Sequence, residues 1–248
     1  MEWQDDAIIL SVRPHGETSL LVGLLSRTHG RHAGLARGAA GPRRRGDFQP
    51  GNQVEAKWRA RRAEHLGTLT CEVSAARAAR CMTDPDALAA LSSACALCDA
   101  GLPERLPMPS LYARLAALLD LVAAATPEWR RDYVAWELAL LAELGFGLDL
   151  TRCAVTGAED DLAFVSPRSG RAVSRAGAGV YAERLLPLPR FLVAPDAPAD
   201  RSALAEGLRL TGYFLHAHVF HPAERKPPDA RARLVDRLIR EPAALQAS

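Results

Sequence analysis

The spacing of the hydrophobic residues changes close to residue 76. Before that point, short runs rich in aliphatic and β-branched residues alternate with turn-forming proline and glycine, which is the pattern of short strands. Five strands are predicted, at residues 7–13, 19–25, 31–37, 53–60 and 66–73. Five short strands with one long glycine-rich basic loop favour an OB-fold β-barrel.

After residue 76, hydrophobic residues recur at the three- and four-residue spacing of helices. Helices are predicted at residues 84–102, from Pro109 onward, and at 127–144, 201–220 and 230–239. Residues 147–180 interrupt this pattern with turn-forming pairs around two short β-like runs.

These patterns predict an α+β protein with two domains. A five-stranded OB-fold domain covers residues 1–78, and an α-helical C-terminal domain covers residues 79–248. A small β-rich insertion occupies residues 147–190 of the helical domain. With 248 residues, the chain is long enough to bury a substantial core.

Composition and charge narrow the class of protein. The sequence has no run of about 18 apolar residues, its five cysteines are scattered, and its acidic start does not resemble a signal peptide, so we expect a cytoplasmic protein. The net charge of +2 conceals a separation, since residues 1–80 carry +5, residues 81–150 carry −6 and residues 151–248 carry +3. A basic N-terminal region on an acidic body is typical of a module that binds a polyanion. A codon-usage bias toward arginine is the alternative explanation.

The predicted loop between the third and fourth strands concentrates positive charge. Arg43, Arg44 and Arg45 follow one another among glycines and a proline, so we expect them in solvent, where guanidinium groups match phosphate oxygens. Phe48 and Trp58 lie nearby and are candidates for stacking on unpaired bases. The alternative is that Trp58 is a core residue and that the arginines only solubilise the loop.

The sequence lacks the common enzyme motifs. It contains no phosphate-binding loop, no dinucleotide-binding glycine pattern, no His-Glu-x-x-His and no Gly-x-Ser-x-Gly. An enzyme of unrecognised type would most naturally use His216, His218 and His221, although histidines two residues apart face different sides of a helix. Cys95 and Cys98 lack the second pair that a closed zinc site requires. We therefore expect neither catalysis nor a cofactor.

Several segments, in order along the chain, resemble the RecO family of recombination mediators. They include Glu-Trp-x-Asp-Asp-Ala-Ile-Ile-Leu at the start, His-Gly-Glu-Thr-Ser at 15–19 and Leu-Gly-Phe-Gly-Leu-Asp-Leu at 144–150. Further matching segments are residues 31–38, 49–51, 153–157 and 166–170. The resemblance implies an N-terminal OB-fold, a helical C-terminal domain and a small zinc-finger-like insertion.

The same resemblance implies a DNA-binding protein of DNA repair and homologous recombination, located in the cytoplasm at the nucleoid. Such a protein binds single- and double-stranded DNA and anneals complementary strands after DNA damage. Together with RecR it helps load RecA onto DNA coated by single-stranded DNA-binding protein, whose acidic C-terminal tail it contacts. The alternative function is that of an RNA-binding OB module on a helical scaffold.

The insertion departs from the pattern of this family. Some members hold zinc there through two Cys-x-x-Cys pairs, but here Thr156 stands where a cysteine would follow Cys153, and residues 166–180 contain no cysteine. We therefore expect a metal-free insertion held together by turns and packing.

Phosphate contact is assigned to the basic residues of the N-terminal domain. The candidates for DNA binding are Arg31, Arg37, Arg43, Arg44, Arg45, Lys57 and Arg59. A weaker second surface is formed by the C-terminal arginines Arg231, Arg233, Arg237 and Arg240.

The acidic, aromatic tail of the single-stranded DNA-binding protein requires an apolar slot with cations at its rim. We expect this slot between the helix that carries Trp136 and Leu140 and the helix that carries Leu208 and Phe214. The candidate rim cations are Arg130, Arg131 and Arg209.

Overall fold

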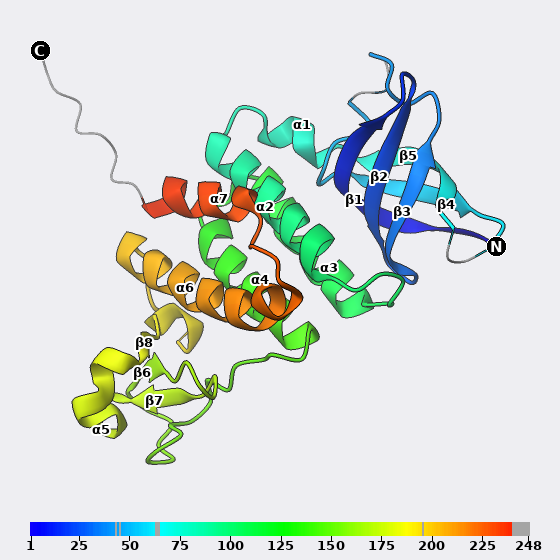
Figure 1. The fold of residues 1–248 in the computed structure, drawn as a ribbon. Helices are drawn as coiled ribbons and strands as arrows, with labels where there is room; N and C mark the ends of the chain where they lie inside the picture. Colours follow the sequence, from blue (N-terminus) through cyan, green and yellow to red (C-terminus); the bar gives the residue numbers. More distant parts are fainter. Residues whose placement is uncertain (43, 45, 63–64, 195, 240–248) are drawn as a thin grey trace, which may run out of the picture.

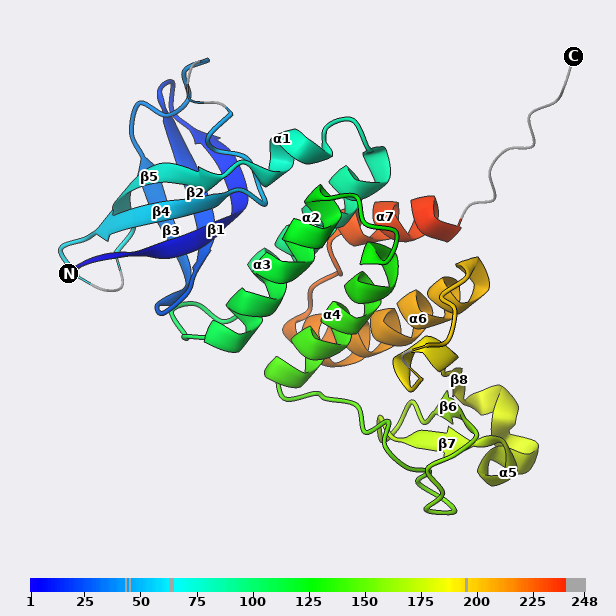
Figure 2. The ribbon, with the colours of Figure 1, turned by 180° about the vertical axis from the view of Figure 1, so that it is seen from behind.

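The structure, a computed structural model, describes residues 1–42, 44, 46–62, 65–194 and 196–239. A β-barrel lies at one end of the elongated molecule, helices fill the middle, and a small three-stranded sheet lies at the other end (Figure 1). The reverse view shows α2 (Pro85–Gly101) and α3 (Pro109–Ala123) between the barrel and the helices that follow them in the chain (Figure 2). No helix in the described part of the chain is long and apolar enough to cross a membrane.

Five strands close the N-terminal barrel in the order β1-β2-β3-β5-β4. Their bounds are β1 (Glu2–His15), β2 (Ser19–Ser26), β3 (Gly30–Ala36), β4 (Gln53–Arg59) and β5 (Gly67–Ala75). Neighbouring strands are antiparallel except β3 and β5, which pair in parallel at Gly34 and Gly67. The predicted five-stranded N-terminal fold is confirmed.

The first strand is longer than the sequence pattern predicts. It begins at Glu2 rather than near residue 7, because its first half pairs with β4 while its second half pairs with β2. Polar residues at the start of β1 conceal the strand pattern in the sequence. One of them, Asp5, has a structural role, because its carboxylate accepts the Thr28 N–H of the β2–β3 turn at 2.7 Å. The polar start of β1 is therefore strand and not a leading tail.

The middle of the molecule is helical, as predicted. Its helices are α1 (Arg77–Cys81), α2 (Pro85–Gly101), α3 (Pro109–Ala123), α4 (Trp129–Glu143), α6 (Arg201–Phe214) and α7 (Asp229–Ile239). The Asp84 carboxylate caps α2 by accepting the N–H groups of Asp86 and Ala87, as the Asp-Pro start predicts. After α6 the chain continues through a π-helical turn, η3 (Leu215–Phe220), and a short 3-10 turn, η4 (His221–Ala223).

The small sheet has the strand order β7-β6-β8. Its strands are β6 (Leu162–Val165), β7 (Ala172–Ser174) and β8 (Leu186–Pro187). Short helical segments follow β7 and β8, namely α5 (Arg175–Ala178), η1 (Gly179–Arg184) and η2 (Arg190–Leu192). The two predicted β-like runs are thus strands, and β8 is an addition that the sequence pattern did not reveal.

The barrel packs directly on the helices. Ile8, Leu10 and Leu25 of the barrel belong to the same buried cluster as the apolar faces of α2 and α3. Gly51, with φ +87°, approaches the Leu91 side chain so closely that a Cβ atom would lie 2.6 Å from it. The barrel and the helices therefore share one core at their junction.

A buried arginine completes this junction. Arg77, only 3% exposed, donates to Asp120 at 2.7 and 3.1 Å and to Gln53 of β4 at 2.8 Å. Asn52, also buried, accepts the Ala78 N–H at 3.0 Å. These bonds fix α1 and α3 against the end of the barrel.

Candidate nucleic-acid interface

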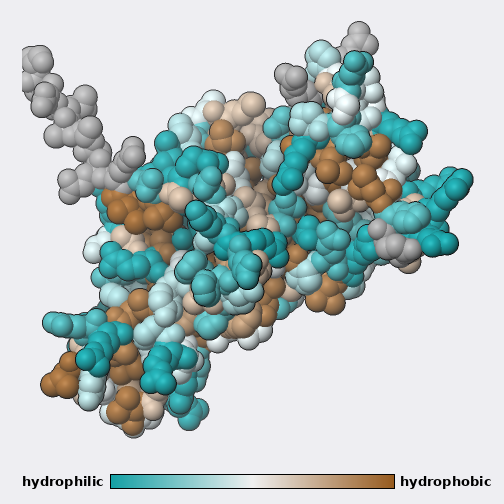
Figure 3. Space-filling view, in the orientation of Figure 1, coloured by the Kyte–Doolittle hydropathy of each residue, from teal (hydrophilic) through white to brown (hydrophobic). Residues whose placement is uncertain are grey.

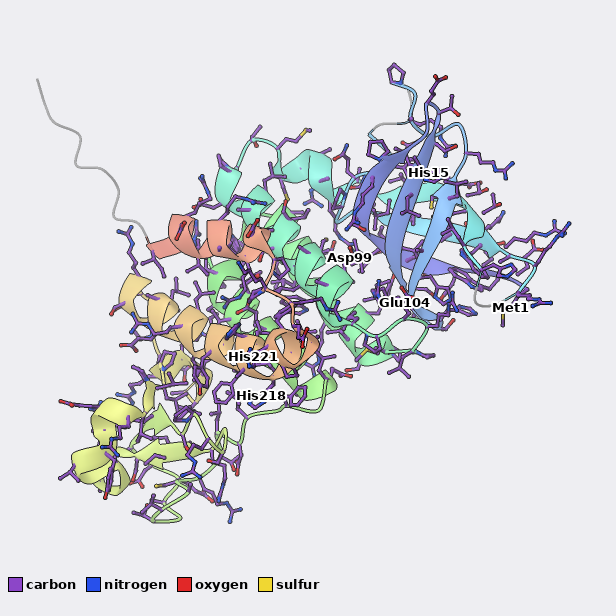
Figure 4. The ribbon with its side chains drawn as sticks, viewed as in Figure 1. Met1, His15, Asp99, Glu104, His218 and His221 are labelled. Atoms are coloured by element: carbon purple, nitrogen blue, oxygen red, sulfur yellow. The ribbon has the colours of Figure 1, made fainter. Side chains whose placement is uncertain are left out.

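A groove of about 620 Å³ opens on the barrel, and Met1 in its lining marks the barrel end that points away from the helices (Figure 4). We call it the basic groove. It is lined by Met1, Arg37, Arg59, Ala60, Arg61, His65, Leu66 and Thr68. Hydrophilic side chains gather on this end of the molecule (Figure 3).

Strand pairing explains why these residues meet. Antiparallel pairing of β1 with β4 sets Glu2 opposite Arg59, and the Met1 amino group donates to the Ala60 carbonyl at 2.8 Å. Parallel pairing of β3 with β5 sets Leu35 opposite Thr68, so Arg37 follows at the same edge. Residues far apart in sequence thus form one surface.

The charges of the basic groove are largely unneutralised. Arg59 makes one ion pair, with Glu2 at 3.7 Å, and both side chains are exposed, which makes such a pair weak. Arg37 and Arg61 have no carboxylate partner among the described residues. Exposed guanidinium groups in this state are suited to bind phosphate oxygens.

Two predicted DNA-binding residues, Arg37 and Arg59, line the basic groove, and a third lies beside it. Lys57 is exposed two residues before Arg59 on β4, so both side chains leave the same face of the strand. Arg61 and His65 were missed by the sequence analysis, although the Arg61-Arg62 pair directly after a predicted strand was a usable signal.

Of the three consecutive arginines, the structure describes only Arg44, and its guanidinium group has partners within the protein. Arg43 and Arg45 lie outside the described residues. Arg44 donates to the Cys71 carbonyl at 3.2 Å, lies 3.7 Å from the Asp47 carboxylate and covers the Phe48 ring at 5.2 Å. Its guanidinium group is therefore engaged in holding the loop on the barrel.

Arg31 faces the helices and not the basic groove. Its guanidinium donates to the Leu102 carbonyl at 2.9 Å and to Glu104 at 3.3 Å, and lies 3.9 Å from Asp99. Figure 4 shows the two acidic residues at the junction of the barrel and the helices. These contacts already occupy the Arg31 guanidinium at the junction, so the predicted DNA contact there would have to compete with them.

The predicted stacking of bases on Trp58 and Phe48 is also wrong, because both rings are in the barrel core. Trp58 is 1% exposed and Phe48 is 3% exposed. The Trp58 indole donates to the Ala33 carbonyl at 2.9 Å and stacks on Trp3, with ring centroids 5.8 Å apart. The core alternative for Trp58 is the correct one.

Two of the C-terminal arginines pair with carboxylates of the helical domain. Arg231 donates two hydrogen bonds, at 2.7 and 2.8 Å, to the fully buried carboxylate of Glu137 on α4. Burial opposes the charged form of Arg231, but the Glu137 carboxylate outweighs burial and raises its pKa. Arg237 pairs with Asp86 at 2.9 Å. Arg233 is exposed, and Arg240 lies outside the described residues.

The predicted slot between α4 and α6 is filled by its own lining. Trp136, Leu140, Leu208 and Phe214 are each at most 4% exposed, so their side chains pack against the core and leave no opening for a peptide. Arg130 pairs with Asp86 at 3.2 Å and covers the Trp129 ring.

The other two predicted rim arginines, Arg131 and Arg209, do not border an open slot either. Arg131 donates to the Phe191 carbonyl at 3.4 Å, and Arg209 is exposed on α6. This pair of helices is core, and the prediction of a slot there is wrong.

Cys153 of the insertion is held by protein hydrogen bonds. Its Sγ accepts the N–H groups of Val155, Thr156 and Ser174 at 3.2 to 3.4 Å and the Ser174 hydroxyl at 3.3 Å. Desolvation raises the pKa of this thiol, but the hydrogen bonds from Ser174 and Thr156 outweigh desolvation and lower it to about 6. One thiolate among hydroxyl and amide groups does not fit a tetrahedral zinc site.

The three candidate histidines of an enzyme site, His216, His218 and His221, do not surround a common centre. His218 stacks between Phe146 and Phe214, with ring centroids 5.1 and 5.7 Å away, and the His216 and His221 rings are 5.7 Å apart. In the described part of the chain no three His, Cys, Asp or Glu side chains are arranged to hold a metal ion.

Comparisons with known proteins cover nearly the whole chain. The family models described as Recombination protein O N terminal and Recombination protein O C terminal match residues 1–77 and 82–227.

Three curated relatives are each named DNA repair protein RecO. The protein of Rhodospirillum rubrum is 50% identical, covering 98% of this chain and 99% of its own. The protein of Rhodospirillum centenum is 53% identical, covering 96% of this chain and 94% of its own. The protein of Dinoroseobacter shibae is 48% identical, covering 97% of this chain and 99% of its own. With an N-terminal five-stranded barrel, a helical C-terminal region and this degree of identity over almost its full length, the chain belongs to the RecO family of DNA repair proteins.

Proposed function

We propose that this protein binds single- and double-stranded DNA through the basic groove and anneals complementary strands as a mediator of homologous recombination. The observation that carries the proposal is the convergence of Arg37, Arg59 and Arg61 at the free end of the barrel. With RecR, the protein would help load RecA onto DNA coated by single-stranded DNA-binding protein. Family membership supports these partner roles.

The chemistry of the basic groove suits annealing. Two DNA strands repel each other through their phosphates, so a protein that brings them together must supply positive charge. It must also leave the base edges free to pair, which favours contacts with the phosphates over contacts with the bases. The groove offers guanidinium groups at its surface, while the nearby tryptophans Trp3 and Trp58 are turned into the core.

Annealing of complementary oligonucleotides tests the proposal. We expect the triple variant Arg37→Ala, Arg59→Ala, Arg61→Ala to lose at least tenfold in annealing rate and in affinity for both strand forms. The loss should be similar for every DNA sequence, because phosphate contacts carry no base information. Annealing of strands already coated by single-stranded DNA-binding protein is measured in the same series.

The matched control removes three other exposed arginines, Arg114, Arg152 and Arg168, from the helices and the insertion. It has the same net charge as the groove variant and should anneal within about twofold of the unmodified protein. Equal losses in the two variants would mean that overall charge, and not the basic groove, attracts DNA. Full activity in the groove variant would contradict the proposal.

A further inference from the structure

A second groove lies between the small sheet and the start of α6. Figure 2 shows that both elements are far from the barrel. Its volume is about 1320 Å³, above the roughly 300–1,000 Å³ typical of small-molecule sites. The lining comes from the loop before β6, from β6 itself, from Arg175 of α5, from Pro187 of β8 and the residues after it, and from the first turns of α6 with the segment that leads into them. A cavity of this size and composite origin suits a length of polypeptide better than a metabolite.

The floor of this groove is apolar. Phe164 and Pro187 face it from the paired strands β6 and β8, and Val193, 36% exposed, faces it from the segment after η2. β8 is an edge strand, but Pro187 has no N–H group to offer to an added strand. A ligand is therefore recognised by its side chains and not by extension of the sheet.

The rim of the groove is acidic. Six carboxylates line it against two guanidinium groups, so the groove is strongly negative. Two of the carboxylates have structural roles, since Asp161 pairs with Arg175 at 3.2 Å and Asp200 caps α6 through the Ala203 N–H.

The remaining four carboxylates have no cationic partner among the described residues. They are Glu159, Asp160, Asp196 and Glu206. Their charges are available to a ligand, and they come from both walls of the groove, on the loop before β6 and on the segment around the start of α6.

We infer that this groove, which we call the acidic groove, binds a segment of a partner protein that carries lysine or arginine together with apolar side chains. Apolar side chains fill the floor, and the cationic groups pair with the rim carboxylates. Nucleic acid and acidic peptides are repelled by the same rim.

The inference goes beyond DNA binding and annealing, because it assigns a protein ligand to the opposite end of the molecule. The barrel and the small sheet are separated by the helices (Figure 1), so both grooves can be occupied together. The basic groove holds an anionic polymer and the acidic groove holds a cationic segment, and each repels the ligand of the other.

Selection from a display library of random twelve-residue peptides tests the inference with the full-length protein. The rim variant Glu159→Lys, Asp160→Lys, Glu206→Lys serves for counter-selection. We expect peptides enriched in lysine or arginine next to leucine, valine or proline, with affinity for the rim variant at least tenfold weaker. The control variant Glu17→Lys, Glu72→Lys, Asp236→Lys carries the same charge change at other exposed positions and should bind the peptides within twofold.

A single substitution in the floor separates specific recognition from simple charge attraction. Val193→Asp adds negative charge to the groove and also removes apolar surface. If the floor takes part in recognition, the selected peptides bind this variant at least threefold more weakly, although charge alone would make them bind more tightly.

Three outcomes overturn the inference. They are enrichment without an excess of cationic residues, equal binding to the unmodified protein and the rim variant, and failure of any peptide to be enriched over the rim variant. The basic-groove variant should bind the peptides normally, so failure of this inference and failure of the proposed DNA binding are seen separately.

Discussion

The arginines at the free end of the barrel and those inside the molecule have the same charge but opposite surroundings. Arg37 and Arg61 face solvent at the basic groove without a carboxylate partner among the described residues. Arg77 and Arg231, in contrast, are enclosed and donate to carboxylates at 2.7 Å. The first pair is free to bind a ligand, and the second pair is already bound to the protein.

This difference has an energetic reason. An enclosed guanidinium must be compensated by hydrogen bonds, since an unpaired buried charge costs several kcal/mol. An exposed one keeps its water and gains little from a protein partner, so its loss hardly affects folding. Removal of an enclosed arginine should therefore lower the stability of the protein, whereas removal of an arginine at the basic groove should weaken DNA binding.

The largest loss of stability is expected for Arg231→Ala. This change leaves the buried Glu137 carboxylate without its partner, for which we expect a decrease of about 3–5 kcal/mol in the free energy of unfolding. Urea denaturation measures it. The double variant Glu137→Leu, Arg231→Met should recover most of the loss, because it removes both charges. A single variant as stable as the unmodified protein would refute the structural role.

A smaller loss is expected for Arg77→Ala at the barrel–helix junction. Its partner Asp120 is largely exposed, so the carboxylate left behind can be hydrated, and we expect about 1–3 kcal/mol. Arg80→Ala, an exposed neighbour on α1, is the control and should change stability by less than about 0.5 kcal/mol. Hydrogen exchange should increase in α1 and at the start of β4 only in Arg77→Ala.

The Cys153 thiolate is a negatively charged counterpart of the enclosed arginines, and it is stabilised by hydrogen bonds instead of an ion pair. Its folded pKa of about 6 lies below the usual value of 9.0, so the folded state favours the thiolate. The resulting stabilisation is complete above pH 9, decreases as the pH falls and is absent below about pH 6.

Thiolate absorbance near 240 nm measures this titration. We expect one of the five cysteines to titrate with a midpoint near pH 6 and Cys153→Ser to abolish that step. Burial raises the pKa of Cys71, Cys81, Cys95 and Cys98, which therefore serve as internal controls. A midpoint at pH 8 or above would show that the hydrogen bonds do not hold a thiolate.

The sequence predicts the fold well, because the fold depends on periodic patterns. Alternation in residues 53–60 and the Asp84-Pro85 start both reappear as β4 and α2. Long-range pairing is less visible. The polar start of β1 gains its strand structure from β4, more than 50 residues away, and the short β8 exists only because β6 lies beside it.

The surface residues were predicted less well, because a sequence does not show which way a side chain points. Arg31 and Arg37 lie near the two ends of one predicted strand, yet Arg31 reaches the helices and Arg37 reaches the basic groove. Trp58 and Trp136 are of a residue type that often binds ligands, but both side chains are buried in the core. Only the packing of the whole chain separates these cases.

The dependence of DNA affinity on salt tests the central claim most directly. Each phosphate contact contributes roughly 0.9 to the slope of log affinity against log salt on double strands and about 0.7 on single strands. Loss of Arg37, Arg59 and Arg61 should therefore lower the slope by about two to three units, with the free energy of unfolding changed by less than about 0.5 kcal/mol. Arg31→Ala should show the opposite result, with an unchanged slope and a less stable fold. An unchanged slope in the groove variant, or a lowered slope in Arg31→Ala, would contradict the assignment of DNA to the basic groove.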